Sequence, residues 1–357
     1  MTIRLGKKEL TIPLIQGGMG VGISRSSLAG AVAACGGMGV ISTAQIGYDE
    51  PDFATDYFHA NNHSIAKHIR IAKEKACGHG MIAVNIMHAL ADYEAHIHAS
   101  IAAGVDAIIC GAGLPMELPE IVGDAPVCIA PIVSSKRAAA LILRIWKKKY
   151  SRFPDFVVIE GPNAGGHLGF HPDDLTDIEG LHFDDEIRSI VSFLHEYAKE
   201  NEVTIPVFAA GGIMTHEDVL HMQSLGVDGV QVATRFVATS ECDASETYKQ
   251  AYCAATQKDV TIIKSPVGMP GRALCNNFVK RSLRERIPVS KCYHCIRGCK
   301  PAEIPYCITK ALIDAVNGDV ENGLIFCGAN VGQIHEISTV PNVIAELLDI
   351  SAAELIF

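Results

Sequence analysis

One histidine lies in a segment whose other residues have little side-chain bulk. The segment runs from Glu160 to Gly169 in the order Glu-Gly-Pro-Asn-Ala-Gly-Gly-His-Leu-Gly, and it follows an apolar, β-branched run. Its glycines allow the backbone to approach a flat ligand closely. Near neutral pH a histidine can act there as a base, a hydrogen-bond donor or an orienting group. His167 is therefore the candidate catalytic residue, and the alternative is a glycine-rich turn with an incidental histidine.

Two further segments could hold a phosphate. One is Ala209 to Met214, with Gly211-Gly212 at its centre, and the other is Gln231 to Phe236. If they follow the seventh and eighth strands of a barrel, their backbone N–H groups lie together in the place where such barrels commonly bind phosphate. The pair predicts a phosphorylated cofactor, although Gly211-Gly212 alone would also suit a tight turn.

Four cysteines are concentrated near the C-terminus. Cys292, Cys295, Cys299 and Cys307 follow a C-x₂-C-x₃-C-x₇-C pattern within sixteen residues, in a chain of twelve cysteines that otherwise scatters them. Thiolates at this spacing can ligate a [4Fe–4S] cluster or a tetrahedral zinc ion. Free thiols are the third option, and the three remain open.

Eight short apolar runs must position these residues. Their continuous rather than alternating apolarity is typical of parallel strands that are buried on both faces, with helices outside. Eight βα units favour a closed (β/α)₈ TIM barrel over an open doubly wound sheet. The predicted strands are Thr11 to Gly17, Met38 to Ser42, Met81 to Met87, Asp106 to Gly111, Pro126 to Val133, Phe156 to Gly161, Pro206 to Gly211 and Gly229 to Phe236.

Helix signals separate the strands. Ser135 and Thr215 are plausible N-caps for helices that start at residues 136 and 216, and the loop that carries His167 is long, because no helix can begin before about Asp184. After about residue 260 the βα rhythm stops. We expect a barrel over residues 1–260 and a C-terminal, cysteine-containing segment over residues 261–357 that packs on it.

Composition narrows the class of protein. The formal charge of −10 disfavours nucleic acid as a partner, and no apolar run reaches the ~20 residues that span a bilayer. Without a secretory leader, the expectation is a cytoplasmic enzyme with reduced thiols and a small-molecule or thioester substrate. A homodimer is compatible with these features. The many other histidines, such as His68 and His96, are interpreted as residues of solvated helix faces.

The chain resembles the nitronate monooxygenases (formerly 2-nitropropane dioxygenases) and the closely similar FMN-dependent enoyl-acyl carrier protein reductases. The resemblance covers about residues 10 to 280 and rests on Gln16 to Gly20, Ala31 to Ser42, Asn85, Gly111 to Gly113, Gly226 to Phe236 and the two segments around Glu160 and Ala209. The cysteine spacing is also similar to the iron–sulfur site of the dienoyl-CoA reductase group, where the last gap is longer.

The resemblance implies an FMN-binding barrel with His167 beside the flavin. One departure is Ala233, where the family usually has glycine before Thr-Arg-Phe, and its methyl group would narrow the phosphate site. The residues that the resemblance assigns to FMN are Gly17, Gly18, Met19, Asn85, Lys136, Glu160, Gly165, Gly166, Gly211, Gly212, Gln231, Ala233 and Thr234.

Two redox reactions then remain. In the first, an alkyl nitronate is oxidised with dioxygen, and a positive or hydrogen-bonding His167 positions the anion or removes an α-proton. In the second, NAD(P)H drives reduction of an enoyl thioester that His167 organises, and an iron–sulfur cluster would favour this reaction. A phosphate-binding barrel without redox activity is the third reading.

Overall fold

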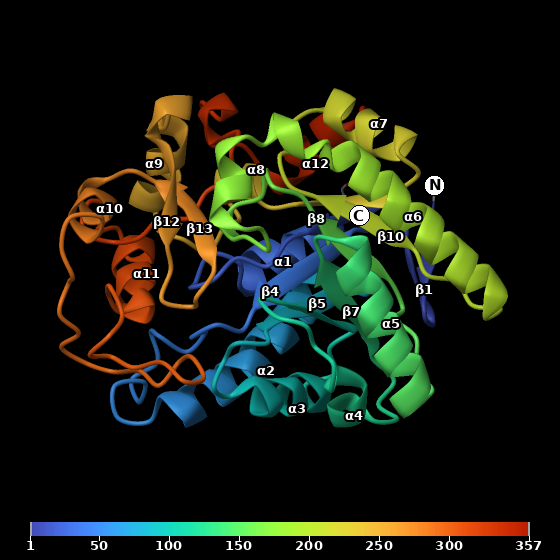
Figure 1. Cartoon of the computed structure of the whole chain (residues 1–357), viewed down its shortest axis with the longest axis horizontal. Helices are drawn as coiled ribbons and strands as arrows, with labels where there is room; N and C mark the ends of the chain where they lie inside the picture. Colours follow the sequence, from blue (N-terminus) through green and yellow to red (C-terminus); the bar gives the residue numbers. More distant parts are fainter. Residues whose placement is uncertain (1, 356–357) are drawn as a thin grey trace.

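The computed structural model describes residues 2–355, and its centre is a closed barrel of eight parallel strands (Figure 1). All eight predicted strands form, so the predicted fold class is confirmed. The last strand is shorter than expected, because the chain turns into the helix α8 (Thr234–Val237) soon after Val232. The barrel strands are β3 (Leu14–Gln16), β4 (Met38–Ser42), β5 (Met81–Met87), β6 (Ala107–Gly111), β7 (Cys128–Val133), β8 (Val157–Glu160), β10 (Val207–Ala210) and β11 (Gly229–Val232).

Helices cover the outside of the barrel. Ser135 and Thr215 accept backbone N–H bonds at the starts of α5 and α7, as their positions predict. After the short α8, the C-terminal helix α12 packs on α1, α7 and α8 and closes the ring between α7 and α1. The outer helices are α1 (Ser26–Ala34), α2 (Tyr57–Ala76), α3 (Tyr93–Ala102), α4 (Leu118–Val122), α5 (Lys136–Tyr150), α6 (Phe183–Glu200), α7 (His216–Ser224) and α12 (Val340–Leu348).

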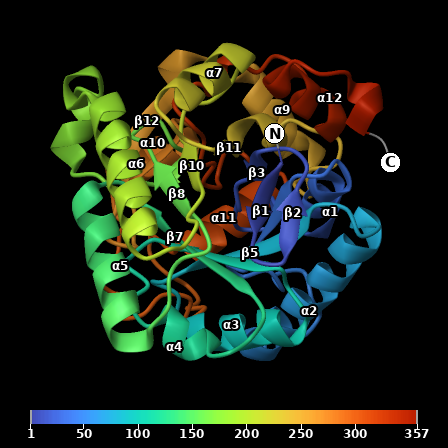
Figure 2. The ribbon, with the colours of Figure 1, turned by 90° about the vertical axis from the view of Figure 1, so that its right-hand side faces the viewer.

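An N-terminal hairpin closes one end of the barrel. Its strands β1 (Ile3–Leu5) and β2 (Lys8–Leu10) pair antiparallel, and Leu5 and Leu10 are fully buried against interior residues such as Phe156. Figure 2 looks along the barrel from this end. The hairpin fills the bottom of the barrel with apolar side chains, so a ligand must enter from the opposite end.

An appendage, residues 246–339, lies at that opposite end, on the left of Figure 1. It adds the antiparallel strands β12 and β13, and β13 also pairs antiparallel with a two-residue strand, β9, so that a three-stranded sheet in the order β12-β13-β9 lies at the barrel mouth. Its elements are β12 (Val260–Lys264), β13 (Pro270–Leu274), α9 (Glu246–Ala254), α10 (Asn277–Ser282) and α11 (Ile308–Val316), and β9 is Gly166–His167. Short 3₁₀ turns occur at Pro172–Thr176, Glu179–Leu181, Gln257–Asp259, Val331–Gln333 and Ala352–Leu355.

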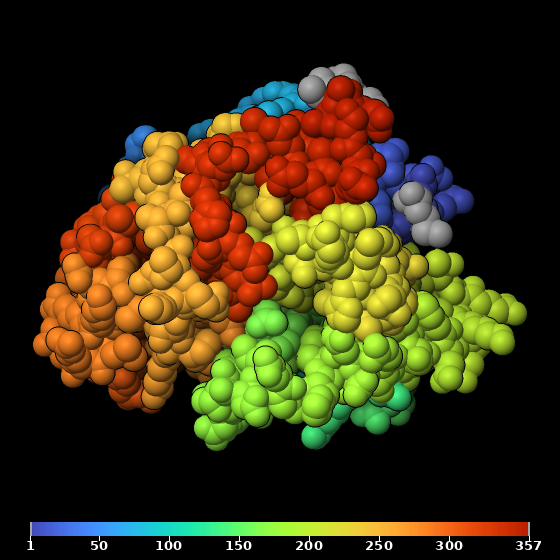
Figure 3. Space-filling model, turned by 90° about the horizontal axis from the view of Figure 1, so that it is seen from above, coloured from blue at the N-terminus to red at the C-terminus, as the bar shows by residue number. Residues whose placement is uncertain are grey.

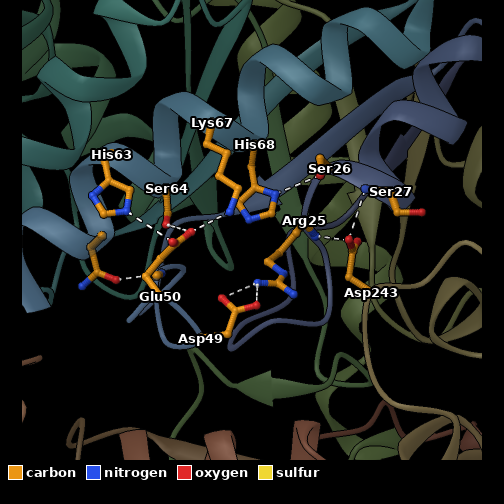
Figure 4. A network of polar contacts seen from close by, with 12 residues as sticks. Arg25, Ser26, Ser27, Asp49, Glu50, His63, Ser64, Lys67, His68 and Asp243 are labelled. Carbon is orange, nitrogen blue, oxygen red and sulfur yellow. Dashed lines mark hydrogen bonds and ion pairs between the residues drawn. The ribbon is translucent and has the colours of Figure 1, made fainter. Parts of the chain in front are cut away.

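A polar network fixes the loop that follows β4 to the first two helices (Figure 4). The Asp243 carboxylate accepts backbone N–H bonds from Arg25, Ser27 and Leu28, and it thereby caps α1. The Arg25 guanidinium donates both of its short bonds to Asp49. These contacts hold the residues just after β4 in place, where they reach the barrel mouth.

The helix histidines divide into two groups. His59, His63 and His98 are exposed, as predicted, but His68 and His96 are buried, so the solvated interpretation is wrong for these two. His68 Nδ1 bonds Ser26 Oγ at 2.8 Å and His96 Nδ1 bonds Thr43 Oγ1 at 3.1 Å. Burial lowers the pKa of each to about 4, so both are neutral packing residues. In the described part of the chain, no helix is long and apolar enough to cross a membrane.

Candidate active site

A deep cavity opens at the carboxyl ends of the barrel strands. It holds about 1380 Å³ of space, counted to its open mouth. Apart from Lys136, every predicted cofactor residue lines it, and so does His167: Gly17, Gly18, Met19, Asn85, Glu160, Gly165, Gly166, Gly211, Gly212, Gln231, Ala233 and Thr234.

His167 is held by a strand rather than by a free loop. It pairs with Gly271 of β13, and its Nε2 lies 2.7 Å from Ser265 Oγ, in the β12–β13 connection. Its ring packs edge-on against Phe326, with centroids 5.0 Å apart. Burial lowers the pKa of His167 to about 4, so the ring is neutral at physiological pH. A neutral ring corresponds to the hydrogen-bonding form of His167, the second of the two forms that the sequence left open.

The cavity carries little charge. Glu160 projects from the end of β8, and burial raises the pKa of its carboxyl to about 7. Among the described residues, no lysine or arginine lines the cavity. Its walls are otherwise glycine backbone, amides such as Asn85 and Gln231, and apolar side chains. An anionic substrate would find no cationic side chain here.

Arg272 tethers the segment that carries His167. It is 3% exposed, and its Nη1 donates to the carbonyl oxygens of Pro162, at 2.7 Å, and Ala164. Both carbonyls belong to the glycine-rich segment between Glu160 and Gly169. A cation buried on β13 therefore sets the path of the chain that leads to the catalytic candidate.

The glycine turn after β10 and the Ala233–Thr234 turn after β11 both line the cavity beside the appendage. Gly211 and Gly212 have φ values of +104° and +83°, which suit glycine, and a Cβ on Gly212 would lie 2.8 Å from the Asn163 Cβ. Above them, Asn330 Nδ2 donates to the Gly212 carbonyl and the Gly328 N–H donates to Thr234 Oγ1. Figure 3 shows the C-terminal segment, in red, lying across the molecule between the orange appendage and the barrel helices.

Lys136 does not reach the cavity. It is the first residue of α5, its side chain is exposed, and its Nζ lies 5.9 Å from the Phe193 ring centre on α6. The prediction that Lys136 lines the cofactor site is therefore wrong. A residue that directly follows a barrel strand can already belong to the outer layer of helices. Ala233 does line the cavity, and its methyl group faces Gly17.

Several residues of the site were missed. Ser265, Arg272, Phe326 and Asn330 belong to the appendage and act across about 100 residues or more of sequence. Their local sequence has no catalytic motif. The C-terminal Phe-Cys-Gly-Ala-Asn run, residues 326–330, is the one signal that could have suggested a cavity wall.

The four clustered cysteines line a second cavity, which we call the cysteine pocket. Cys292, Cys295, Cys299 and Cys307 are all free thiols and half-buried. In residues 2–355, no group of three or more His, Cys, Asp or Glu side chains is arranged to hold a single metal ion. The cysteines therefore surround a space instead of converging on one point.

A closed parallel barrel with a glycine-lined cavity at the carboxyl ends of its strands defines a (β/α)₈-barrel enzyme. The chain matches the family described as "Nitronate monooxygenase" over residues 3–349. It belongs to this family.

Two relatives match the chain over different lengths. A "Probable nitronate monooxygenase" of Staphylococcus saprophyticus is 30% identical over 127 residues, which are 36% of this chain and 34% of that protein. The match thus spans about a third of that relative's length. A "(3aS,4S,5R,7aS)-5-hydroxy-7a-methyl-1-oxo-octahydro-1H-indene-4-carboxyl-CoA dehydrogenase" of Rhodococcus jostii is 26% identical over 281 residues, 78% of this chain and 67% of that protein.

Solved structures share the fold. FabK from Thermotoga maritima superposes with a TM-score of 0.71 at 24% identity, over 95% of this chain and 92% of that chain. Nitroalkane oxidase from Streptomyces ansochromogenes gives 0.68 at 20% identity, over 97% and 96%. At these identities, the likeness shows the architecture and leaves the reaction to the residues of the site.

Proposed function

We propose that the cavity binds FMN, with the phosphate at Gly211, Gly212 and the Gln231–Thr234 turn and the flavin ring near Gly17, Gly18 and Asn85. The fit is supported by the lining. Gly166 borders the cavity with φ +70°, and a Cβ there would meet no protein atom within 4 Å. The polar groups are backbone N–H groups, amides and the Thr234 hydroxyl, which suit a phosphate and a heterocycle edge. When bound, FMN supplies reversible two-electron chemistry.

The substrate that best suits this cavity is an enoyl thioester whose reacting acyl group is uncharged, reduced at the expense of NAD(P)H. The absence of lysine and arginine from the described cavity lining is the observation that carries this choice. A nitronate anion would lie beside the Glu160 carboxyl and a neutral His167, with no cation to offset its desolvation. A neutral acyl group incurs no such penalty.

His167 has the geometry of an oxyanion donor. Ser265 Oγ accepts the Val267 N–H at 3.3 Å, so its own hydrogen is free for His167 Nε2. When Ser265 donates this bond, the imidazole proton lies on Nδ1, for which the described residues provide no hydrogen-bond partner. Nδ1–H would then donate to the thioester carbonyl oxygen, where negative charge develops as hydride reaches the β-carbon.

Glu160 is the group that can deliver the proton for the α-carbon. With a pKa of about 7, its carboxyl is partly protonated at neutral pH, unlike an ordinary glutamate. Hydride at one carbon and this proton at the other saturate the double bond. The Rhodococcus jostii relative, whose name describes a CoA-linked carboxyl group, supports a thioester substrate for this chain.

Nitronate oxidation with dioxygen is the second candidate. It is favoured by the family match over residues 3–349 and by the names of the staphylococcal relatives. In this reaction, His167 would hydrogen-bond the anion as a neutral ring.

Anaerobic mixing separates the two reactions. We expect NADH or NADPH to bleach the flavin absorption rapidly, crotonyl-CoA to restore it, and propane-2-nitronate to leave it unchanged. The His167→Ala variant should keep FMN and lose most of the reoxidation by crotonyl-CoA, whereas His195→Ala, a change at an exposed residue of α6, should not. Bleaching by the nitronate but not by NAD(P)H would reverse the choice in favour of nitronate oxidation.

A further inference from the structure

We infer that the cysteine pocket binds a [4Fe–4S] cluster through Cys292, Cys295, Cys299 and Cys307. All four thiols line one cavity with about 730 Å³ of space, counted to its mouth, and all four are free. Four thiolates from one segment are the usual ligand set of such a cluster. This site is separate from the main cavity and does not depend on which substrate the enzyme uses.

The segment that carries the cysteines lacks an apolar core of its own. Between α10 and α11, residues 283–307 form no helix and no strand beyond one isolated bridge, and no residue from 283 to 305 is buried. Irregular connections longer than about 12–15 residues are uncommon in compact domains. Segments without a core are commonly held by disulfides or metals, and this one has no disulfide.

The shape of the pocket favours a cluster over zinc. A zinc ion needs four sulfurs converging at about 2.3 Å from one point, which leaves no space between them. In the described chain, no such single-ion arrangement exists, and open space lies between the thiols instead. A group of several iron and sulfide atoms requires that space.

The surroundings suit an anionic cluster. The His294 backbone N–H donates to Cys292 Sγ at 3.4 Å, and hydrogen bonds to ligand sulfurs stabilise clusters of this kind. Arg297 lines the pocket, with its guanidinium 5.4 Å from the Tyr93 ring centre, and Lys291 lies next to Cys292 in sequence. These cations offset the negative charge that four thiolates bring.

The pocket is joined to the catalytic barrel at two places. The Ala91 N–H donates to the Cys295 carbonyl and the Arg297 N–H to the Ala89 carbonyl, in the loop that follows β5. Helix α11 starts at the pocket with Ile308 and reaches the main cavity with Leu312, about 6 Å further along its axis. Helix α11 therefore links the wall of the cysteine pocket to the wall of the main cavity.

Metal analysis of the anaerobically purified wild-type protein tests the site directly. We expect about four iron and about four acid-labile sulfide atoms per chain, and an electron paramagnetic resonance signal of a reduced cluster after addition of dithionite. The Cys295→Ala/Cys299→Ala double variant should lose the iron and the signal. Cys253→Ala, which changes a half-buried cysteine on α9, should keep both.

Three results would overturn the inference. They are about one zinc per wild-type chain, no iron or sulfide even after anaerobic reconstitution with ferrous iron and sulfide, and iron that the double variant retains. The wild-type analysis decides even if the double variant does not fold. Protein that contains iron but no flavin would contradict only the proposed function. Protein that contains FMN but no iron would contradict only the inference that the cysteine pocket binds a cluster.

Discussion

At the scale of single residues, the site contains two side chains whose pKa values are shifted by burial. His167 is neutral because the cavity removes water from it, and Glu160 is partly protonated for the same reason. The sequence predicted both positions, since each lies in the glycine-rich segment at the end of a strand. It could not predict their protonation, which depends on walls that are supplied by distant parts of the chain.

The raised pKa of Glu160 has a consequence for stability. The folded-state pKa of about 7 lies above the ordinary 4.5. The contribution of this carboxyl to the free energy of unfolding is therefore fully present below about pH 4.5 and is lost as pH rises through about 7. Glu160→Gln mimics the protonated form. We therefore expect this variant to gain stability relative to the wild-type enzyme between pH 5 and pH 8, measured by urea unfolding of the FMN-loaded proteins.

The matched change is Glu179→Gln, at an exposed carboxylate, which should show no such trend. A stability difference between Glu160→Gln and wild type that stays constant over this pH range would mean that Glu160 titrates like an ordinary glutamate.

At the scale of elements, the pairing of β9 with β13 turns the glycine-rich segment into a fixed platform. Arg272 donates hydrogen bonds to the Pro162 and Ala164 carbonyls of this platform. Arg272→Met leaves both carbonyls without a partner, at a cost of about 1–3 kcal/mol each. We expect a lower denaturation midpoint and a fall in kcat that exceeds the change in KM, because His167 loses its position. Arg144→Met, at an exposed residue of α5, serves as the control. Unchanged kcat in folded Arg272→Met would remove the positioning role.

Some elements can be predicted from the sequence and others cannot. The barrel strands are visible in the sequence because each is a continuous apolar run that is buried on both faces. The two-residue β9 has no periodicity of its own, and its partner lies about 100 residues away. Lys136 fails for a related reason, since the first residue of a helix can face the cavity or the outer layer, and only packing against Phe193 decides.

At the scale of the whole molecule, one end of the barrel is closed by the N-terminal hairpin and the other is shaped by the appendage. The same C-terminal region supplies Phe326 and Asn330 to the cavity and α12 to the outer ring. The end of the βα rhythm predicts a boundary near residue 260, whereas the appendage begins with α9 at Glu246. The sequence does not predict that the chain returns to the barrel after the appendage, because the residues of one helix do not show which elements it packs against.

The flavin content of the purified protein tests most directly whether the main cavity holds FMN. We predict the absorption bands of oxidised flavin and about one FMN per chain, released on denaturation. Gly212→Ala should lower that content, because its Cβ crowds Asn163 at the phosphate site, whereas Gly104→Ala, with a similar positive φ and open space around it, should not. A colourless protein that binds no FMN on reconstitution, or a Gly212→Ala variant with full FMN content, would contradict the account.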